Sequence, residues 1–245
     1  MPLITLASRL YSLYSKIVEI WRKEKSILED IIKIMELLGT VAFAISGSLV
    51  AISSELDMFG VSFLACITAF GGGIVRDLLM GINPPQIFNS FYVFLLALAV
   101  AILVFIISYV CKKSFNSFKT KIERIDNVFD AIGLSAFVVI GSEMACSRGF
   151  LDNGFIVVFM GMITGVGGGI FRDILIDTTP YVFKKHIYAI AAIMGSITYF
   201  LLRKYMQNVQ LASIVSMVLV FSIRMLATRY RWSLPRIHIE DDNER

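Results

Sequence analysis

Residues 71–77 read GGGIVRD, and residues 167–173 read GGGIFRD, 96 positions further along the chain. The match extends on both sides of these stretches, since Gly39, Ala42, Phe43, Gly47 and Pro84 correspond to Gly133, Ala136, Phe137, Gly141 and Pro180. Self-similarity of this kind indicates an internal repeat. The sequence therefore predicts two copies of one unit, repeat 1 over 34–113 and repeat 2 over 125–204.

The composition indicates what kind of unit is repeated. Apolar residues make up 57% of the 245 residues, charged residues make up 17%, and the mean hydropathy is +0.75. Soluble globular chains have about 45–50% apolar and about 25% charged residues. An integral membrane protein is therefore expected, and the formal net charge of +4 indicates membrane orientation rather than nucleic-acid binding.

Apolar runs of about 16–23 residues recur along the chain, each long enough to cross a hydrocarbon core of about 30 Å. They cover 37–53, 60–80, 91–110, 128–147, 154–176, 187–202 and 211–228. Three crossings fall in each copy, so the second copy enters the membrane from the opposite side. We therefore expect an all-α membrane domain over 37–228 with seven transmembrane helices, formed by two inverted three-helix repeats and a seventh helix over 211–228.

The two ends of the chain differ from this domain. Residues 1–36 form an amphipathic N-terminal segment that does not span, and residues 229–245 form a polar tail. Lys and Arg are more frequent in the short loops on the C-terminal side of the membrane. Since basic short loops stay in the cytoplasm, we expect a multi-pass protein of the plasma membrane with its N-terminus outside and its C-terminus cytoplasmic.

The glycine triplets lie inside the second and fifth crossings. Each glycine costs about 1 kcal/mol relative to alanine in a helix, so a duplicated triplet requires a reason. We expect the triplets to break both helices and to line a transport pathway, as in other inverted repeats; close packing between helices is the alternative. The candidate pore or kink residues are Gly71, Gly72, Gly73, Gly167, Gly168 and Gly169.

Charged residues follow each triplet, as Arg76-Asp77 and Arg172-Asp173. Charges at membrane depth are costly and usually face a cavity or one another. Because adjacent residues of a helix point in different directions, we expect crossed ion pairs, Arg76 with Asp173 and Arg172 with Asp77. The alternative partner of each arginine is an anionic group in the pathway.

Two further charges lie near the ends of the apolar runs. Glu143 is close to one end of the fourth crossing, and Arg224 is close to one end of the seventh. Long charged side chains at such positions reach the membrane interface. We therefore expect both side chains to lie at the interface, without a role in the pathway.

The sequence lacks the motifs of nucleotide-binding proteins and hydrolases. Gly71-x-Gly73 and Gly165-x-Gly167 complete neither a dinucleotide fingerprint nor a phosphate-binding loop, and no span contains a histidine or a GxSxG nucleophile. The three cysteines lie far apart, which indicates neither a disulfide framework nor a metal cluster. We expect no enzymatic activity and no cofactor.

With its two glycine triplets, each followed by Ile-x-Arg-Asp, and with three helices per copy, the sequence resembles the prokaryotic branch of the trimeric intracellular cation channel family, TRIC, over about 34–228. The resemblance implies a homotrimer in membrane lipid, with one pore per protomer kinked at the triplets. It also implies conduction of potassium and sodium. Lipid gating through basic residues of the fourth helix does not carry over, because residues 128–146 contain no Lys or Arg.

The same three-helix repeat is also known as a glycine transporter domain, which leaves a second hypothesis open. Arginines facing a cavity would repel potassium but suit the carboxylate of glycine or another small amino acid. Ion pairing of Arg76 and Arg172 with aspartates would cancel that effect and favours the channel. A structural scaffold without transport is the third class.

Overall fold

The computed structural model describes residues 30–111, 119–184 and 187–232, and within these ranges it contains helices and no strand. The long helices are Asp30–Ser53 (the first helix), α2 (Met58–Leu79), α3 (Phe91–Val110), α5 (Lys119–Ala145), α6 (Gly154–Leu175), α8 (Tyr188–Met206) and α9 (Val209–Tyr230). Three short helices are η1 (Gln86–Asn89), η2 (Cys146–Phe150) and α7 (Tyr181–Lys184). The expected all-helical membrane fold is confirmed.

Six of the long helices are long and apolar enough to cross a membrane. The described helix α8 is not among them, because it contains three tyrosines and ends with Arg203 and Lys204. The first helix includes residues 30–36, which the sequence placed in the amphipathic segment. Residues 1–29 and 233–245, with most of that segment and of the polar tail, lie outside the described residues.

Side-chain caps fix where several helices begin. Asp57 precedes α2 and accepts a hydrogen bond from the Gly60 N–H, and Asn153 precedes α6 and accepts one from the Ile156 N–H. These caps lie 96 positions apart, as the two triplets do. A capping side chain satisfies one of the free N–H groups of the first turn, so the repeat extends to the helix starts.

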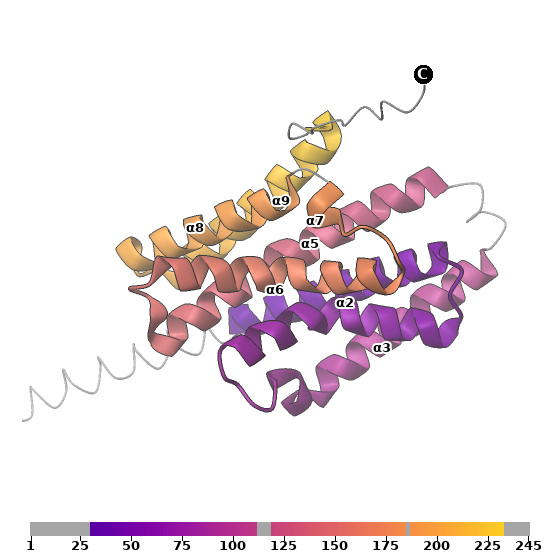
Figure 1. Cartoon of the computed structure of the whole chain (residues 1–245), viewed down its shortest axis with the longest axis horizontal. Helices are drawn as coiled ribbons and strands as arrows, with labels where there is room; N and C mark the ends of the chain where they lie inside the picture. Colours follow the sequence, from indigo (N-terminus) through magenta and orange to yellow (C-terminus); the bar gives the residue numbers. More distant parts are fainter. Residues whose placement is uncertain (1–29, 112–118, 185–186, 233–245) are drawn as a thin grey trace, which may run out of the picture.

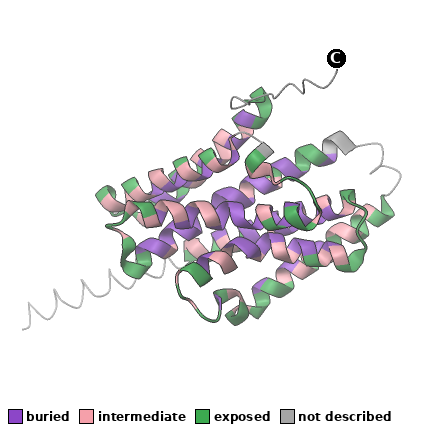
Figure 2. Cartoon of the chain, viewed as in Figure 1, coloured by how far each residue is buried: buried purple, intermediate pink, exposed green. Residues whose placement is uncertain are grey.

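The long helices run roughly along the long axis of the molecule, with α2 and α6 side by side at its centre (Figure 1). α6 also contacts α5 and α8, while α9 packs on α5 and α8 and α3 packs on α2. Buried residues follow the interior of this bundle and exposed residues cover its outside (Figure 2). α3 buries only Val93, Ala97 and Ala101, so its apolar outer surface suits contact with lipid.

The glycine triplets do not interrupt their helices, and this part of the sequence prediction is wrong. α2 is α-helical through Gly71–Gly73, and α6 is α-helical through Gly167–Gly169. Positive φ angles among the described glycines occur at Gly81 and Gly149, outside both triplets. The helical penalty of glycine is offset here by packing between helices, as described next.

The triplets lie where α2 and α6 approach most closely. A Cβ atom on Gly72 would fall on the carbonyl oxygen of Thr164, and one on Gly168 would fall on the carbonyl oxygen of Thr68. A Cβ on Gly167 would lie 2.8 Å from the Gly72 Cα. Because the obstacles are backbone atoms, only glycine allows the two helices to approach this closely.

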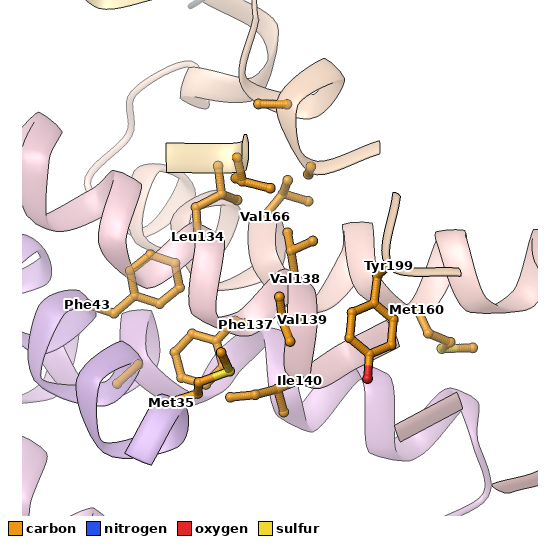
Figure 3. Packing of buried hydrophobic residues seen from close by; sticks show 14 of the residues in the cluster. Met35, Phe43, Leu134, Phe137, Val138, Val139, Ile140, Met160, Val166 and Tyr199 are labelled. Carbon is orange, nitrogen blue, oxygen red and sulfur yellow. The ribbon is translucent and has the colours of Figure 1, made fainter. Parts of the chain in front are cut away.

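The contacts between the two copies are reciprocal. Thr68 faces Gly168 and Gly72 faces Thr164, so α2 and α6 run antiparallel past each other. The Phe43 ring occupies the space beside Gly133, and the Phe137 ring the space beside Gly39. The two rings stack with centroids 5.3 Å apart in the buried core (Figure 3). Such paired contacts fit an axis that relates the repeats.

We predict that Gly72→Ala destabilises the protein, because its methyl group would push α2 away from the Thr164 carbonyl. Overpacking of this kind costs about 1–3 kcal/mol or more. Thermal unfolding of the purified protein in detergent should show a lower midpoint. Gly73→Ala is the matched control, since its Cβ would meet only the Arg76 Nη2 at 3.8 Å. Equal losses in the two variants would contradict the packing role of Gly72.

Candidate functional site

The arginine and aspartate that follow each triplet pair with each other within the same helix. The Arg76 Nη2 lies 2.6 Å from the Asp77 Oδ1, and the Arg172 Nε lies 2.8 Å from the Asp173 Oδ1. Both arginines are in the last turn of their helices, where the helix dipole favours a cation. The expected crossed pairs, Arg76 with Asp173 and Arg172 with Asp77, are therefore wrong.

The antiparallel register explains why crossed pairs do not form. Since Thr68 faces Gly168, Asp173 lies level with residue 63 of α2. Arg76 is 13 residues further along, or roughly 20 Å at 1.5 Å per residue. An arginine side chain is too short for this distance, but it is long enough to fold along its own helix to the next residue.

The second carboxylate oxygen of each aspartate holds the loop that follows its helix. The Asp77 Oδ2 accepts a hydrogen bond from the Gln86 N–H at 2.8 Å, and the Asp173 Oδ2 accepts one from the Tyr181 N–H at 2.7 Å. Each aspartate thus joins an arginine to the start of a short helix, η1 or α7. The repeated Arg-Asp pair has a structural function at both ends of the bundle.

At the α6 end, the pair belongs to a larger buried network. The Arg172 Nη1 donates to the Ser46 Oγ at 2.7 Å and to the Asp130 Oδ1 at 3.2 Å, and the Tyr188 hydroxyl donates to the same Asp130 oxygen at 3.1 Å. The Ser46 hydroxyl in turn donates to the Asp126 Oδ1 at 2.5 Å. We call this network the Asp130 cluster; it comprises Ser46, Asp126, Asp130, Arg172, Asp173, Tyr188 and Arg224.

The seventh helix contributes Arg224 to this cluster. Its Nη2 lies 3.6 Å from the Asp130 Oδ2, and its guanidinium lies 4.5 Å from the centre of the Tyr188 ring. Arg224 is only 2% exposed. The expectation that this side chain reaches the membrane interface is therefore wrong, because α9 turns it toward α5 and α8.

Glu143 is also buried rather than at the interface. Its Oε2 accepts a hydrogen bond from the Tyr199 hydroxyl at 2.5 Å and lies 3.4 Å from the Arg203 Nε. Glu143 is two residues from Ala145, the last residue of α5, so the sequence did place it near the helix end. What the sequence missed is that α8 supplies two polar partners that allow the carboxylate to stay inside.

A cavity of about 270 Å³ opens beside the Asp130 cluster, between the ends of the first helix, α5 and α6. Its polar lining consists of three acidic and five hydroxyl-bearing residues: Glu123, Asp126, Asp173, Ser53, Ser54, Thr178, Thr179 and Tyr181. The remaining lining is apolar, and no Lys or Arg lines this cavity in the part of the chain that the structure describes. The cavity is therefore suited to a cation.

The six candidate glycines fall into two groups, according to what an added Cβ atom would contact. Gly71, Gly72, Gly167 and Gly168 are buried and lie against side chains or backbone of the opposite helix. Gly73 instead faces the Arg76 Nη2, 3.8 Å from an added Cβ, whereas Gly169 faces the Asp130 cluster, with the Tyr188 hydroxyl at 3.2 Å and the Arg172 Nη2 at 3.8 Å.

Sequence reasoning did not assign five members of the cluster to the site: Ser46, Asp126, Asp130, Tyr188 and Arg224. One signal was available, because Asp126 and Asp130 are four residues apart and share a face of α5. Arg224 stood out as a charge in an apolar run but was placed at the interface, since its partners lie on other helices.

Comparisons with known proteins agree with this architecture. The family model described as "Glycine transporter" matches residues 33–109 and again residues 127–204. The UPF0126 membrane protein YvgT of Bacillus subtilis is 34% identical over 211 residues, which are 86% of this chain and 98% of the relative. The UPF0126 inner membrane protein YadS of Escherichia coli K12 is 34% identical over 211 residues, 85% and 97% of the two chains.

Two solved structures are similar over nearly their whole length. A prokaryotic TRIC channel in 0.5 M KCl is 35% identical, with a TM-score of 0.74, and the match covers 84% of this chain and 100% of that one. The TRIC trimeric intracellular cation channel orthologue from Rhodobacter sphaeroides is 28% identical, with a TM-score of 0.73, and the match covers 82% and 99%. Both are channels, a class without enzymatic activity.

The chain is thus a helical membrane protein with the fold of the prokaryotic TRIC channels. It belongs to the Glycine transporter family, and the curated relatives described above are UPF0126 membrane proteins.

We predict that Asp173→Asn lowers the free energy of unfolding by about 3 kcal/mol, because it leaves Arg172 buried with one fewer charged partner. Thermal unfolding in detergent measures the loss. Asp177→Asn, four residues further on and exposed, is the control and should be neutral. If the Asp173→Asn protein is as stable as wild type, Asp130 alone is sufficient to neutralise the buried charge of Arg172.

Proposed function

We propose that the protein is a channel for monovalent cations such as potassium and sodium. The observation that carries the proposal is the lining of the cavity, where three carboxylates and five hydroxyl groups occur without a basic residue. Oxygen-rich, negatively charged linings attract cations and replace part of their hydration shell. The similarity to TRIC cation channels supports the same conclusion.

The Asp130 cluster extends this polar lining into the bundle. Asp126 and Asp173 belong to both the cavity and the cluster. Deeper in, four atoms of the Asp130 cluster have no hydrogen-bond partner within the described residues: the Asp130 Oδ2, the Arg172 Nη2, and the Nε and Nη2 of Arg224. Buried polar atoms of this kind are ordinarily solvated, which supports a hydrated pathway along α5 and α6.

The arrangement favours weak binding of a small cation. Within the part of the chain that the structure describes, no group of three His, Cys, Asp or Glu side chains is arranged to hold a metal ion. Conduction requires binding strong enough for entry and weak enough for release. Separate carboxylates with hydroxyl groups between them meet this requirement better than a closed divalent-metal site.

Amino-acid transport is less well supported by the same geometry. A transporter for glycine needs a cation that meets the substrate carboxylate, yet Arg172 is fully buried and bound to Asp130 and Asp173. Arg76 is 6% exposed and bound to Asp77. Both arginines are already neutralised by aspartates.

We expect wild-type protein in planar bilayers to give unitary potassium currents. Under a KCl gradient, their reversal potential should show that the channel selects cations over chloride. Asp126→Asn, which removes one carboxylate of the cavity, should reduce conductance at low salt several-fold. Asp152→Asn, an exposed carboxylate outside the cavity, is the control and should conduct like wild type. Saturable glycine uptake without single-channel steps would instead favour the transporter.

The assembly and orientation form a second part of the proposal. The protein is a homotrimer in lipid with one pore per protomer, and it lies in the plasma membrane with its N-terminus outside and its C-terminus cytoplasmic. Termini on opposite sides require that α8 crosses the membrane together with the six helices that are long and apolar enough to do so, which is part of the proposal.

We predict a trimer in native mass spectrometry and activity of a cytoplasm-specific reporter fused at the C-terminus. The basic short loops on that side are the physical reason for the orientation. A monomer that still conducts would contradict the homotrimer. A C-terminal reporter that is active only outside the cell would contradict the cytoplasmic C-terminus.

A further inference from the structure

The seventh helix brings a charge into the bundle that the repeats themselves do not contain. Arg224 of α9 is buried, lies 3.6 Å from the Asp130 Oδ2 and stacks on the Tyr188 ring. Asp130 is thereby placed between two guanidinium groups, since Arg172 binds its other oxygen at 3.2 Å.

The first repeat has a matching acidic residue, Glu36. Glu36 lies three residues before Gly39, as Asp130 lies three residues before Gly133. Glu36 lies close enough to Arg76 and Asp77 to interact electrostatically with both. α9 follows repeat 2 and adds Arg224 only at the Asp130 end of the bundle, so the two ends differ by one buried positive charge.

We propose that Arg224 is a conductance-determining residue that limits how strongly the Asp130 cluster attracts cations. The inference rests on the proposed channel function. Three carboxylates, Asp126, Asp130 and Asp173, face two guanidinium groups, which leaves the cluster itself with one net negative charge. Arg224 therefore keeps the pathway attractive to cations without creating a site that traps them.

Replacing Arg224 by glutamine tests this role directly. Arg224→Gln leaves two net negative charges in the cluster, so potassium conductance at about 20 mM KCl should rise about three- to tenfold. The effect should shrink toward wild type at about 1 M KCl, where the Debye length is about 3 Å. Unitary conductance at both salt concentrations is the measurement.

Further variants separate charge from structure. Arg224→Lys keeps the charge and should conduct like wild type, while Asp130→Asn should lower low-salt conductance. The double variant Asp130→Asn/Arg224→Gln restores the net charge and should return close to wild type. Arg229→Gln, an exposed arginine of the same helix, is the matched control without an expected effect.

A merely structural role would change stability without changing the salt dependence. The proposal is overturned if Arg224→Gln conducts like wild type at both salts, or if the double variant is no closer to wild type than Arg224→Gln. Where Arg224→Gln does not fold, an unchanged low-salt conductance of Asp130→Asn overturns it. Absence of cation currents in wild type would refute the channel function itself, whereas a conducting wild type with an unaltered variant would refute only the role of Arg224.

Discussion

The backbone contact between α2 and α6 is the constraint on which the other features depend. Gly72 meets the Thr164 carbonyl and Gly168 meets the Thr68 carbonyl, so both helices are held at a distance that no other residue type permits. This contact fixes the antiparallel register. The register in turn places the Arg76-Asp77 pair at one end of the bundle and the Arg172-Asp173 pair at the other.

The buried charges are stabilised locally and then used differently at the two ends. Each arginine lies at the C-terminal end of its helix with an adjacent aspartate, so the helix dipole and a carboxylate both favour it. At the α6 end, residues of the first helix, α5, α8 and α9 join the pair to form the Asp130 cluster beside an acidic cavity. The buried polar residues of the Asp130 cluster are thereby continuous with the polar lining of the cavity.

The sequence was sufficient to predict an all-helical membrane fold, because long apolar runs recur along it and the duplicated GGGI-x-RD stretch indicates an internal repeat. The predicted helix breaks failed for a physical reason: a glycine costs about 1 kcal/mol in a helix whether the helix breaks or packs closely. The crossed ion pairs failed because repeat symmetry alone does not give the register of two helices. Arg224 was placed at the interface instead of in the bundle because its partners, Asp130 and Tyr188, lie 94 and 36 residues away on other helices.

The reciprocal contacts have a consequence for how the two copies can diverge after a gene duplication. Gly72 is opposite Thr164 while its counterpart Gly168 is opposite Thr68, so each copy forms the template against which the other must fit. A substitution at one of these positions therefore disturbs the packing of the other copy. It has to be compensated by a second substitution in that copy. Sequence similarity of the two triplets follows from their mutual contact, independently of what passes through the membrane.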